Sequence, residues 1–424
     1  MKNTFKINLD TTILYRLRNK INEQNNISYN KIYGKFRAWD KICAIMDRLD
    51  DTVDFLNELK LNTGRYERSA FDFYEFMNNS SVIVDCIKEL AKIFNVSDDK
   101  IKKSTNIFNR LGKDNKGTDE KYFEYLRSLC SVHPVETSRH KRYQDNDFEC
   151  SPFVLWNNTG ICNDDYDIYA VVYTSKDECA NKRVGIYMNQ IFKYIETRLN
   201  FVNDIIDEID KYQKKVIEDF INTPIKREEE FENYIEYLKN LDIEMKLRFG
   251  SDTWYRFEYV IRLLELKVSN PYNEDKINLY INALKYAIKF EHNNIQNMSN
   301  IGFENNGLLY NENKIETTLY IELQSPYSGS QETRKYGYNL EKIGYLNYDS
   351  GSSNKSWAYI QLKQASDFLE RYVSFQGAQG DFEYYALVQT ALYLDCLENK
   401  CLINKNIPND LKYRKKLLSN NELN

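Results

Sequence analysis

Residues 122–143 read YFEYLRSLCSVHPVETSRHKRY, and this stretch combines a helical pattern with two of the three histidines in the chain. Its apolar residues recur at spacings of three and four, which predicts an amphipathic helix. We expect the helix to end at His133, because Pro134 disfavours the α conformation in the residue before it. The second histidine, His140, follows seven residues later. The stretch therefore places an imidazole at a predicted helix end.

The same stretch is locally basic on a chain that is acidic overall. The sequence has 58 Lys and Arg residues against 63 Asp and Glu residues, a net charge of −5, which excludes a global field that attracts nucleic acid or anionic membrane. Any anion site must be local, and four cations gather here: Arg127, Arg139, Lys141 and Arg142. Arginine matches the geometry of a phosphate, and histidine exchanges a proton near neutral pH. The stretch is therefore a candidate for chemistry on a phosphate.

The spacing of Arg127 and His133 determines how the two side chains can meet. In a regular α-helix, a separation of six residues places them about 120° apart around the axis. One helix then cannot easily bring both groups to the same atom. Two copies of the helix that face each other across a dimer axis can supply both groups around one groove, and we therefore expect a homodimer.

Composition excludes several other classes of protein. The chain has 424 residues, of which 42% are hydrophobic and 14% aromatic, too apolar for a disordered chain. The sequence shows no signal peptide and no uncharged apolar run near the roughly 20 residues that cross a bilayer, so we expect a soluble, cytoplasmic protein without a membrane partner. The eight cysteines are scattered over a long chain, which favours free thiols over a disulfide framework.

The flanking sequence predicts a mainly α N-terminal domain, residues 1–224, with a small β insertion at about 150–187. Apolar stripes predict helices near 34–60 and 70–94, and Thr118 is the expected N-cap of the next helix. A long helix is expected to run from Ile191 to Phe220. Segments rich in β-branched and aromatic residues predict three strands, at Ser151–Trp156, Asp167–Ser175 and Lys182–Tyr187.

The charge run Lys226–Glu230 suggests a boundary, after which residues 225–424 form a helical C-terminal region. Helical patterns recur near 228–248, 252–268, 273–292, 356–375 and 381–399. Between them, residues 293–355 are rich in Asn, Gly, Ser and Tyr and are predicted to be mostly irregular, with one strand at Thr317–Leu323.

An Arg followed after four to six residues by His, at the end of a bundle helix, resembles the signature of the HEPN superfamily of ribonucleases. The resemblance covers roughly residues 34–221 and includes Arg127-Ser-Leu-Cys-Ser-Val-His133. It implies a helical bundle that dimerises, with paired motifs that line a cleft in which RNA is cut without metal or another cofactor. It further implies that Arg127 polarises the scissile phosphate and that His133 transfers a proton.

The expected function is therefore a metal-independent endoribonuclease that cleaves RNA by attack of the 2′-hydroxyl, and the resemblance implies the role of a toxin or antiviral defence effector. Arg127 and His133 are the predicted catalytic residues. Weaker RNA contacts are expected from Arg139, His140, Lys141 and Arg142. The alternative function is a non-catalytic helical scaffold or sensor whose C-terminal region binds a regulatory protein partner.

Other patterns in the sequence favour simpler explanations. His133, His140, Cys150, Cys162 and Cys179 are zinc-ligand types, but no C-x-x-C pair is present. Acidic residues flank two predicted strands near Lys182 without a nuclease spacing: Asp164, Asp165, Asp167, Asp177 and Glu178. Ser350–Ser356 lacks the glycines of a phosphate loop and is interpreted as a flexible turn. The helical spacing of Tyr255, Phe257, Tyr259, Tyr280, Tyr286 and Phe290 favours a core over a base-stacking surface. Arg127 and His133 also admit a purely structural interpretation, as a surface ion pair and a helix-end contact.

Overall fold

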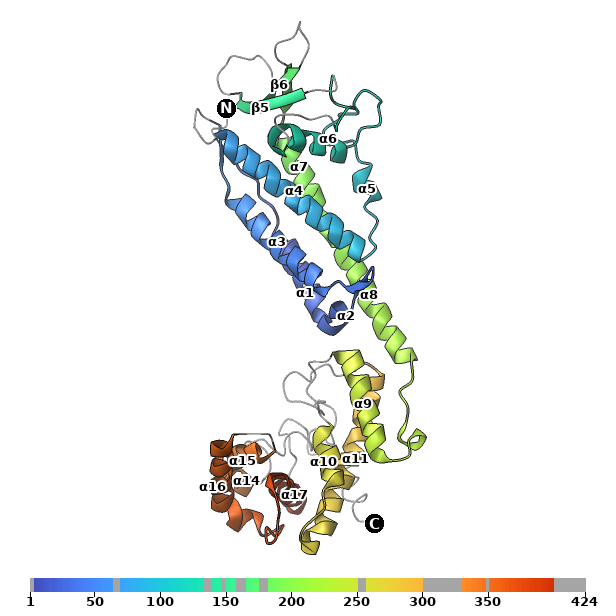
Figure 1. Cartoon of the computed structure of the whole chain (residues 1–424), viewed down its shortest axis with the longest axis vertical. Helices are drawn as coiled ribbons and strands as arrows, with labels where there is room; N and C mark the ends of the chain where they lie inside the picture. The colour runs from blue at the N-terminus through green and yellow to red at the C-terminus, as the bar shows by residue number, and fades with distance from the viewer. Residues whose placement is uncertain are drawn as a thin grey trace. The chain divides into compact units, whose positions relative to one another are not determined.

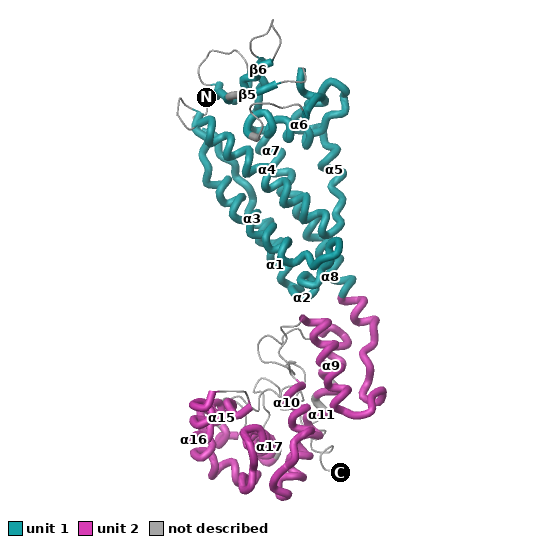
Figure 2. Tube along the Cα trace, in the orientation of Figure 1, with its two compact units in different colours: residues 1–216 teal, residues 217–424 magenta. Residues whose placement is uncertain are grey.

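The computed structural model describes nine stretches of the chain, and they are mainly helical (Figure 1). These stretches are residues 4–63, 69–132, 139–145, 149–157, 165–174, 182–250, 257–299, 330–347 and 351–399. The chain divides into two compact units, residues 1–216 and 217–424 (Figure 2). This division falls inside one helix, α8, whereas the sequence places the boundary at residue 224.

Unit 1 is a helical bundle with a small sheet. Its helices are α1 Thr12–Glu23, α2 Asn25–Tyr29, α3 Trp39–Glu58, α4 Ser69–Ile93, α5 Asp99–Lys102, α6 Asp119–Arg127, α7 Met188–Asn200 and α8 Val202–Asn222. Helix α4 packs against both α3 and α7, as Figure 1 shows. The predicted helix near 70–94 is confirmed, and its apolar stripe, which includes Phe73, Met77 and Ile87, is buried in the core. Burial of such large apolar side chains supplies most of the stability of the bundle.

The predicted helix near 34–60 begins later than expected, at Trp39. Phe36, which lies within the predicted range, instead belongs to a hairpin of β2 Ile32–Tyr33 and β3 Phe36–Arg37. Gly34 makes the turn possible with a φ of +65°, a left-handed conformation that favours glycine. As a result, Phe36 is 78% exposed. A second short pair joins β1 Thr4–Phe5 to β4 Leu61–Asn62.

The predicted β insertion is confirmed as an antiparallel sheet of order β5-β6-β7. Its strands are β5 Glu149–Trp156, β6 Ile168–Thr174 and β7 Lys182–Ile186. Ala170 at the centre of β6 pairs with Val154 of β5 and Val184 of β7. Most of β6 is buried, and Ile168, Ala170 and Val172 belong to the hydrophobic core of unit 1.

The long helix expected from Ile191 to Phe220 is two helices, α7 and α8, which are separated at Phe201. The backbone of Phe201 keeps right-handed helical dihedrals, and its N–H lies within hydrogen-bond distance of the carbonyls of Thr197 and Arg198. The apolar stripe continues across this irregular residue, so the periodicity in the sequence does not reveal it.

Unit 2 is also helical, and its main elements are α9 Tyr234–Phe249, α10 Glu258–Glu265, α11 Glu274–Gln296, α14 Gln331–Lys335, α15 Gly337–Ile343, α16 Ser352–Leu369 and α17 Asp381–Glu398. Short 3-10 turns lie at Glu228–Glu230, Pro271–Asn273 and Gly344–Leu346. Phe257, Tyr259 and Tyr280 are buried, so the core interpretation is confirmed for these members of the aromatic series. Tyr255, and the side chains of Tyr286 and Phe290, lie outside what the structure describes.

The composition of residues 293–355 predicts a mostly irregular segment, and this prediction is wrong for the part that the structure describes. Helices α14 and α15 occupy Gln331–Lys335 and Gly337–Ile343. Ile343 and Leu346 are buried in the core of unit 2, so a composition rich in polar residues and glycine still forms packed helix here. The predicted strand at Thr317–Leu323 lies outside the described residues.

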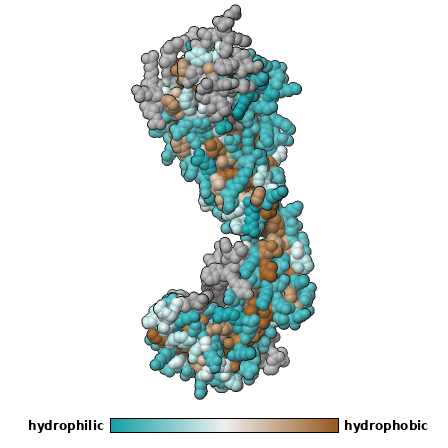
Figure 3. Space-filling view, in the orientation of Figure 1, coloured by the Kyte–Doolittle hydropathy of each residue, from teal (hydrophilic) through white to brown (hydrophobic). Residues whose placement is uncertain are grey.

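Polar side chains cover most of the described surface that Figure 3 presents, with apolar ones scattered among them. Within the described residues, no helix combines the length and the apolar character that a bilayer crossing requires.

Candidate functional site

Helix α6, which ends at Arg127, begins with a well-formed cap. Thr118 has extended dihedrals, and its side-chain oxygen accepts a hydrogen bond from Lys121 N at 3.4 Å, which confirms the predicted N-cap. The next residue, Asp119, is 2% exposed and accepts hydrogen bonds from the backbone N–H groups of Ile107 and Phe108. These contacts attach the preceding loop to the start of the helix.

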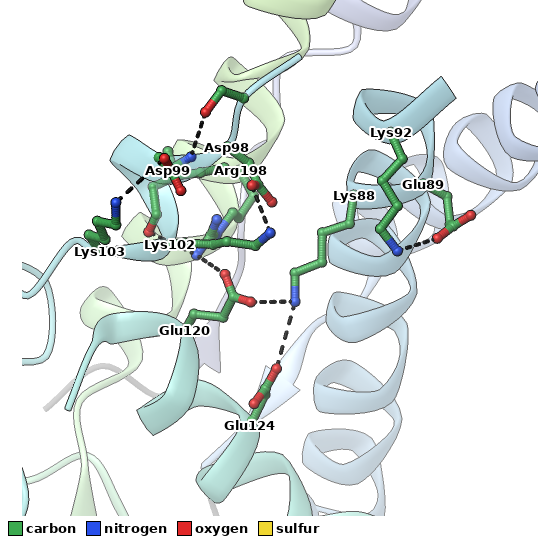
Figure 4. Close-up of polar contacts among 12 residues, drawn as sticks. Lys88, Glu89, Lys92, Asp98, Asp99, Lys102, Lys103, Glu120, Glu124 and Arg198 are labelled. Carbon is green, nitrogen blue, oxygen red and sulfur yellow. Dashed lines mark hydrogen bonds and ion pairs between the residues drawn. The ribbon is translucent and has the colours of Figure 1, made fainter. Parts of the chain in front are cut away.

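A buried ion network holds α6 against two other helices (Figure 4). Glu120 accepts from the Arg198 Nη2 atom of α7 at 3.0 Å and pairs with the Lys88 Nζ atom of α4 at 2.7 Å. Arg198 is 2% exposed and also donates to the carbonyl of Ile101 at 3.2 Å. Because a buried charge needs such partners, the network determines where α6 lies in the bundle.

Arg127 is the last residue of α6 and lacks a described partner. The residue is half-buried, and its Nε atom is buried without a hydrogen-bond acceptor among the described residues. No ion pair joins its guanidinium to a carboxylate in that part of the chain. A buried donor without an acceptor is costly and uncommon in folded proteins, and a catalytic role or a bound ion is one explanation for it.

The backbone after Arg127 is not the regular α-helix that the sequence predicted. Residues Ser128–Val132 form a π-helical turn, in which Leu129 and Cys130 are buried. A π-turn is wider than an α-turn, so the angle derived for Arg127 and His133 from a regular helix does not apply. His133 itself lies outside the described residues. Burial raises the pKa of Cys130 to about 12, which keeps this neighbouring thiol protonated and weakly reactive at neutral pH.

The structure separates the predicted RNA contacts into different environments. Arg139 and Lys141 are exposed. His140 is half-buried, and its ring meets that of Tyr125 edge to face with centroids 5.9 Å apart. Since Tyr125 and Arg127 project about 160° apart around α6, His140 contacts a different side of the helix from Arg127.

Arg142 is the most constrained of these cations. Its guanidinium donates to both carboxylate oxygens of Asp114, at 2.6 and 2.8 Å. A loop, residues 110–118, packs closely on this arginine: Gly112 has a φ of +71°, and a Cβ there would lie 2.1 Å from Arg142 Cγ. The backbone N–H of Lys113 donates to the Arg142 carbonyl at 3.0 Å. Arg142 therefore anchors the loop.

This contact predicts an acid-sensitive loop. The Arg142 guanidinium lowers the pKa of Asp114 to about 2. A lowered carboxyl pKa means that the contact is fully formed above the ordinary Asp value and is lost as pH falls through about 2. We expect an NMR titration of the Asp114 carboxyl to show this low midpoint. In Arg142→Ala the midpoint should return toward its ordinary value, and an unchanged midpoint would exclude the pair as the cause.

The structure provides local explanations for two of the other patterns. Asp167 accepts a hydrogen bond from Met188 N at 2.9 Å and so caps α7. Lys182 pairs with Asp145 at 2.6 Å.

The described part of Ser350–Ser356 begins α16, so the expected flexible turn is wrong from Ser352 onward. The candidates Cys162, Asp164, Asp177, Glu178 and Cys179 lie outside the described residues. Within the stretches that the structure describes, no three His, Cys, Asp or Glu residues are grouped as metal ligands would be.

Arg198 and Glu120 were not identified from the sequence. A signal was present, because Arg198 falls on the apolar stripe of α7 and α8 that contains Ile191, Ile195 and Val202. A charge on a buried stripe requires a partner, although the sequence does not say which residue supplies it.

Comparison with known proteins adds no relative: no family model, no curated protein and no solved structure matches the chain.

Proposed function

We propose that the protein is a metal-independent endoribonuclease of HEPN type that acts as a homodimer, in the role of a toxin or antiviral defence effector. One observation carries the proposal: Arg127, at the end of an anchored helix, has a buried Nε atom without an acceptor among the described residues. An arginine at the end of an anchored helix, without a carboxylate partner among the described residues, is suited to bind a phosphate and to stabilise the charge that develops on it during cleavage.

In the proposed reaction, Arg127 binds the scissile phosphate. The 2′-oxygen forms a bond to phosphorus while the bond to the 5′-oxygen breaks, and His133 transfers a proton to or from these oxygens. Arg139 and Lys141, which are exposed, extend the contact to neighbouring phosphates. His140 and Arg142 contribute less, because His140 packs on Tyr125 and Arg142 is paired with Asp114.

The test is to incubate the purified protein with structured and unstructured RNA in excess EDTA. We expect cleavage that leaves a 2′,3′-cyclic phosphate, and we expect a substrate with a single 2′-deoxy nucleotide at the cut site to resist at that position. The chelator separates this reaction from a metal-dependent one. Loss of all cleavage in EDTA, or equal cleavage of the 2′-deoxy substrate, would contradict the proposal.

The alternative, a scaffold or sensor that binds a protein through its C-terminal region, is favoured by a different observation. Trp357 and Ile360 lie three residues apart on α16 and are 44% and 49% exposed. Large apolar side chains on one exposed helix face are typical of protein contacts. Phe257 and Tyr280 of the same unit are buried and are unsuited to such a contact.

A further inference from the structure

Unit 1 contains a cavity of about 220 Å³ beside α6. Residues 108–110, α6 and the junction of β7 and α7 line it. Its walls include two buried aromatic rings, a third ring at the junction, two amides and one guanidinium. These belong to Phe108, Tyr122, Tyr187, Asn109, Gln190 and Arg110. Because three separate segments supply them, the cavity depends on the folded unit.

Arg110 supplies a cation whose described partner is a phenol rather than a carboxylate. Its Nη2 atom donates to the hydroxyl of Tyr166 at 3.2 Å. Among the described residues, Arg110 forms no ion pair with Asp or Glu, in contrast to Arg142 and Arg198. A neutral phenol orients a guanidinium without cancelling its charge, so Arg110 remains available to an anion.

The ring of Tyr166 is held by close packing. It lies against Gly185 of β7, where a Cβ would come within 2.3 Å of the ring carbons. It also packs on Tyr187, with ring centroids 4.8 Å apart. Only glycine leaves room for the ring at position 185, so the backbone of β7 fixes Tyr166, and Tyr166 in turn orients Arg110.

The aromatic and amide groups define the other part of the cavity. Tyr122 and Phe108 are 7% and 3% exposed, and their rings pack on one another with centroids 5.2 Å apart. Asn109 and Gln190 line the same cavity with amides that both donate and accept hydrogen bonds. Because these two rings are almost fully buried, the groups that can reach a ligand are the amides, which match the hydrogen-bonding edge of a nucleobase.

We propose that this cavity binds a nucleoside monophosphate unit, with the edge of its base on the amide side chains and its phosphate on Arg110. The amides of Asn109 and Gln190 line the same cavity as Arg110, and a guanidinium is the group that best matches a phosphate. The unit has two possible sources, a free mononucleotide or a nucleotide within an RNA chain. The cavity uses neither Arg127 nor His133, so the inference does not depend on the proposed cleavage.

Calorimetry on the full chain carrying Arg127→Ala tests the inference in the absence of the proposed cleavage. The probes are AMP, GMP, CMP and UMP, with adenosine and inorganic phosphate as fragments, and a tetranucleotide with 2′-O-methyl groups. We expect at least one monophosphate to bind at least tenfold more tightly than either fragment, because base and phosphate are recognised together. Comparable or tighter binding of the tetranucleotide would identify RNA as the source, whereas preference for the mononucleotide would identify a free ligand.

Two variants locate the binding. Arg110→Gln should weaken it at least tenfold, while Arg183→Gln, which removes an exposed cation of β7 that lies over Tyr169 and outside the cavity, should leave it unchanged. Arg110→Lys keeps the charge but cannot form the two parallel hydrogen bonds of a guanidinium, so it should also weaken binding. It provides a second test if the glutamine variant is unstable. Absence of binding by every monophosphate at millimolar concentration, or equal binding by wild type and a folded Arg110 variant, would overturn the proposal.

Discussion

Replacing Arg127 with alanine is expected to reduce RNA cleavage by about 100- to 1,000-fold, the usual effect of removing one group that stabilises a transition state. The same substitution should change the free energy of unfolding by about 1 kcal/mol or less. We expect a large loss of activity with a small loss of stability because the Nε atom of Arg127 donates to no acceptor among the described residues. Removing the side chain therefore removes no described hydrogen bond from the fold. Initial cleavage rates and urea unfolding of both proteins measure the two quantities.

Arg127→Lys distinguishes a positioned guanidinium from a simple positive charge. Lysine keeps the charge but cannot form two parallel hydrogen bonds to a phosphate, so we expect only partial recovery of the rate. Arg16→Ala serves as the matched control, because Arg16 is an exposed arginine of α1 that bonds to Asn203. A loss of activity in the control equal to that in Arg127→Ala would indicate a general charge effect and would remove Arg127 from the site.

The largest expected effect on stability comes from Glu120. Glu120→Ala leaves Arg198, which is 2% exposed, without its only described carboxylate partner, and breaking a buried pair typically costs about 3–5 kcal/mol. Because the same carboxylate pairs with Lys88, the substitution also removes one of the two described ion pairs between α6 and α4. Denaturant unfolding followed by circular dichroism measures the change.

Glu124→Ala is the control for this prediction, since Glu124 lies one turn further along α6 and pairs with the same Lys88 at 3.6 Å. Its side chain is 49% exposed, against 12% for Glu120. Exposed pairs contribute about 0–1 kcal/mol, so this variant should unfold close to wild type. If both variants lost the same stability, burial of the network would not be the cause.

Local patterns in the sequence were sufficient to predict much of unit 1. Helix α4 was found because Phe73, Met77 and Ile87 share one face and that face is the buried one. Runs of β-branched residues interrupted by turn residues predict the strands β5 to β7, and Thr118 supplies the side-chain acceptor that a helix start needs. These features depend on interactions between residues that are close in sequence.

The errors arise where the backbone departs from a regular helix, because the spacing of apolar residues does not reveal such a departure. Phe36 fits a helical stripe, yet the turn at Gly34 places it on an exposed hairpin. The spacing of Arg127 and His133 gives an angle around the helix axis only if the helix is regular, and the π-turn after Arg127 breaks that regularity.

The same limit applies to the candidate site. The basic cluster was visible as a cluster, but the partner of Arg142 is Asp114, 28 residues earlier in the chain. Spacing cannot identify a pair of this kind. Nor could it show that Arg127 has no described partner, because that depends on where the other charged side chains lie after folding.

The central claim, a site composed of Arg127 from one protomer and His133 from the other, is tested by complementation. Arg127→Ala and His133→Ala chains with different affinity tags are co-expressed, and the mixed dimer is purified through both tags. In the mixed dimer one of the two sites receives an intact Arg127 and an intact His133, so it should regain about half of the wild-type activity, although each variant alone is inactive. A purified mixed dimer as inactive as its parents, or a chain that is monomeric while it cleaves RNA, would contradict the claim.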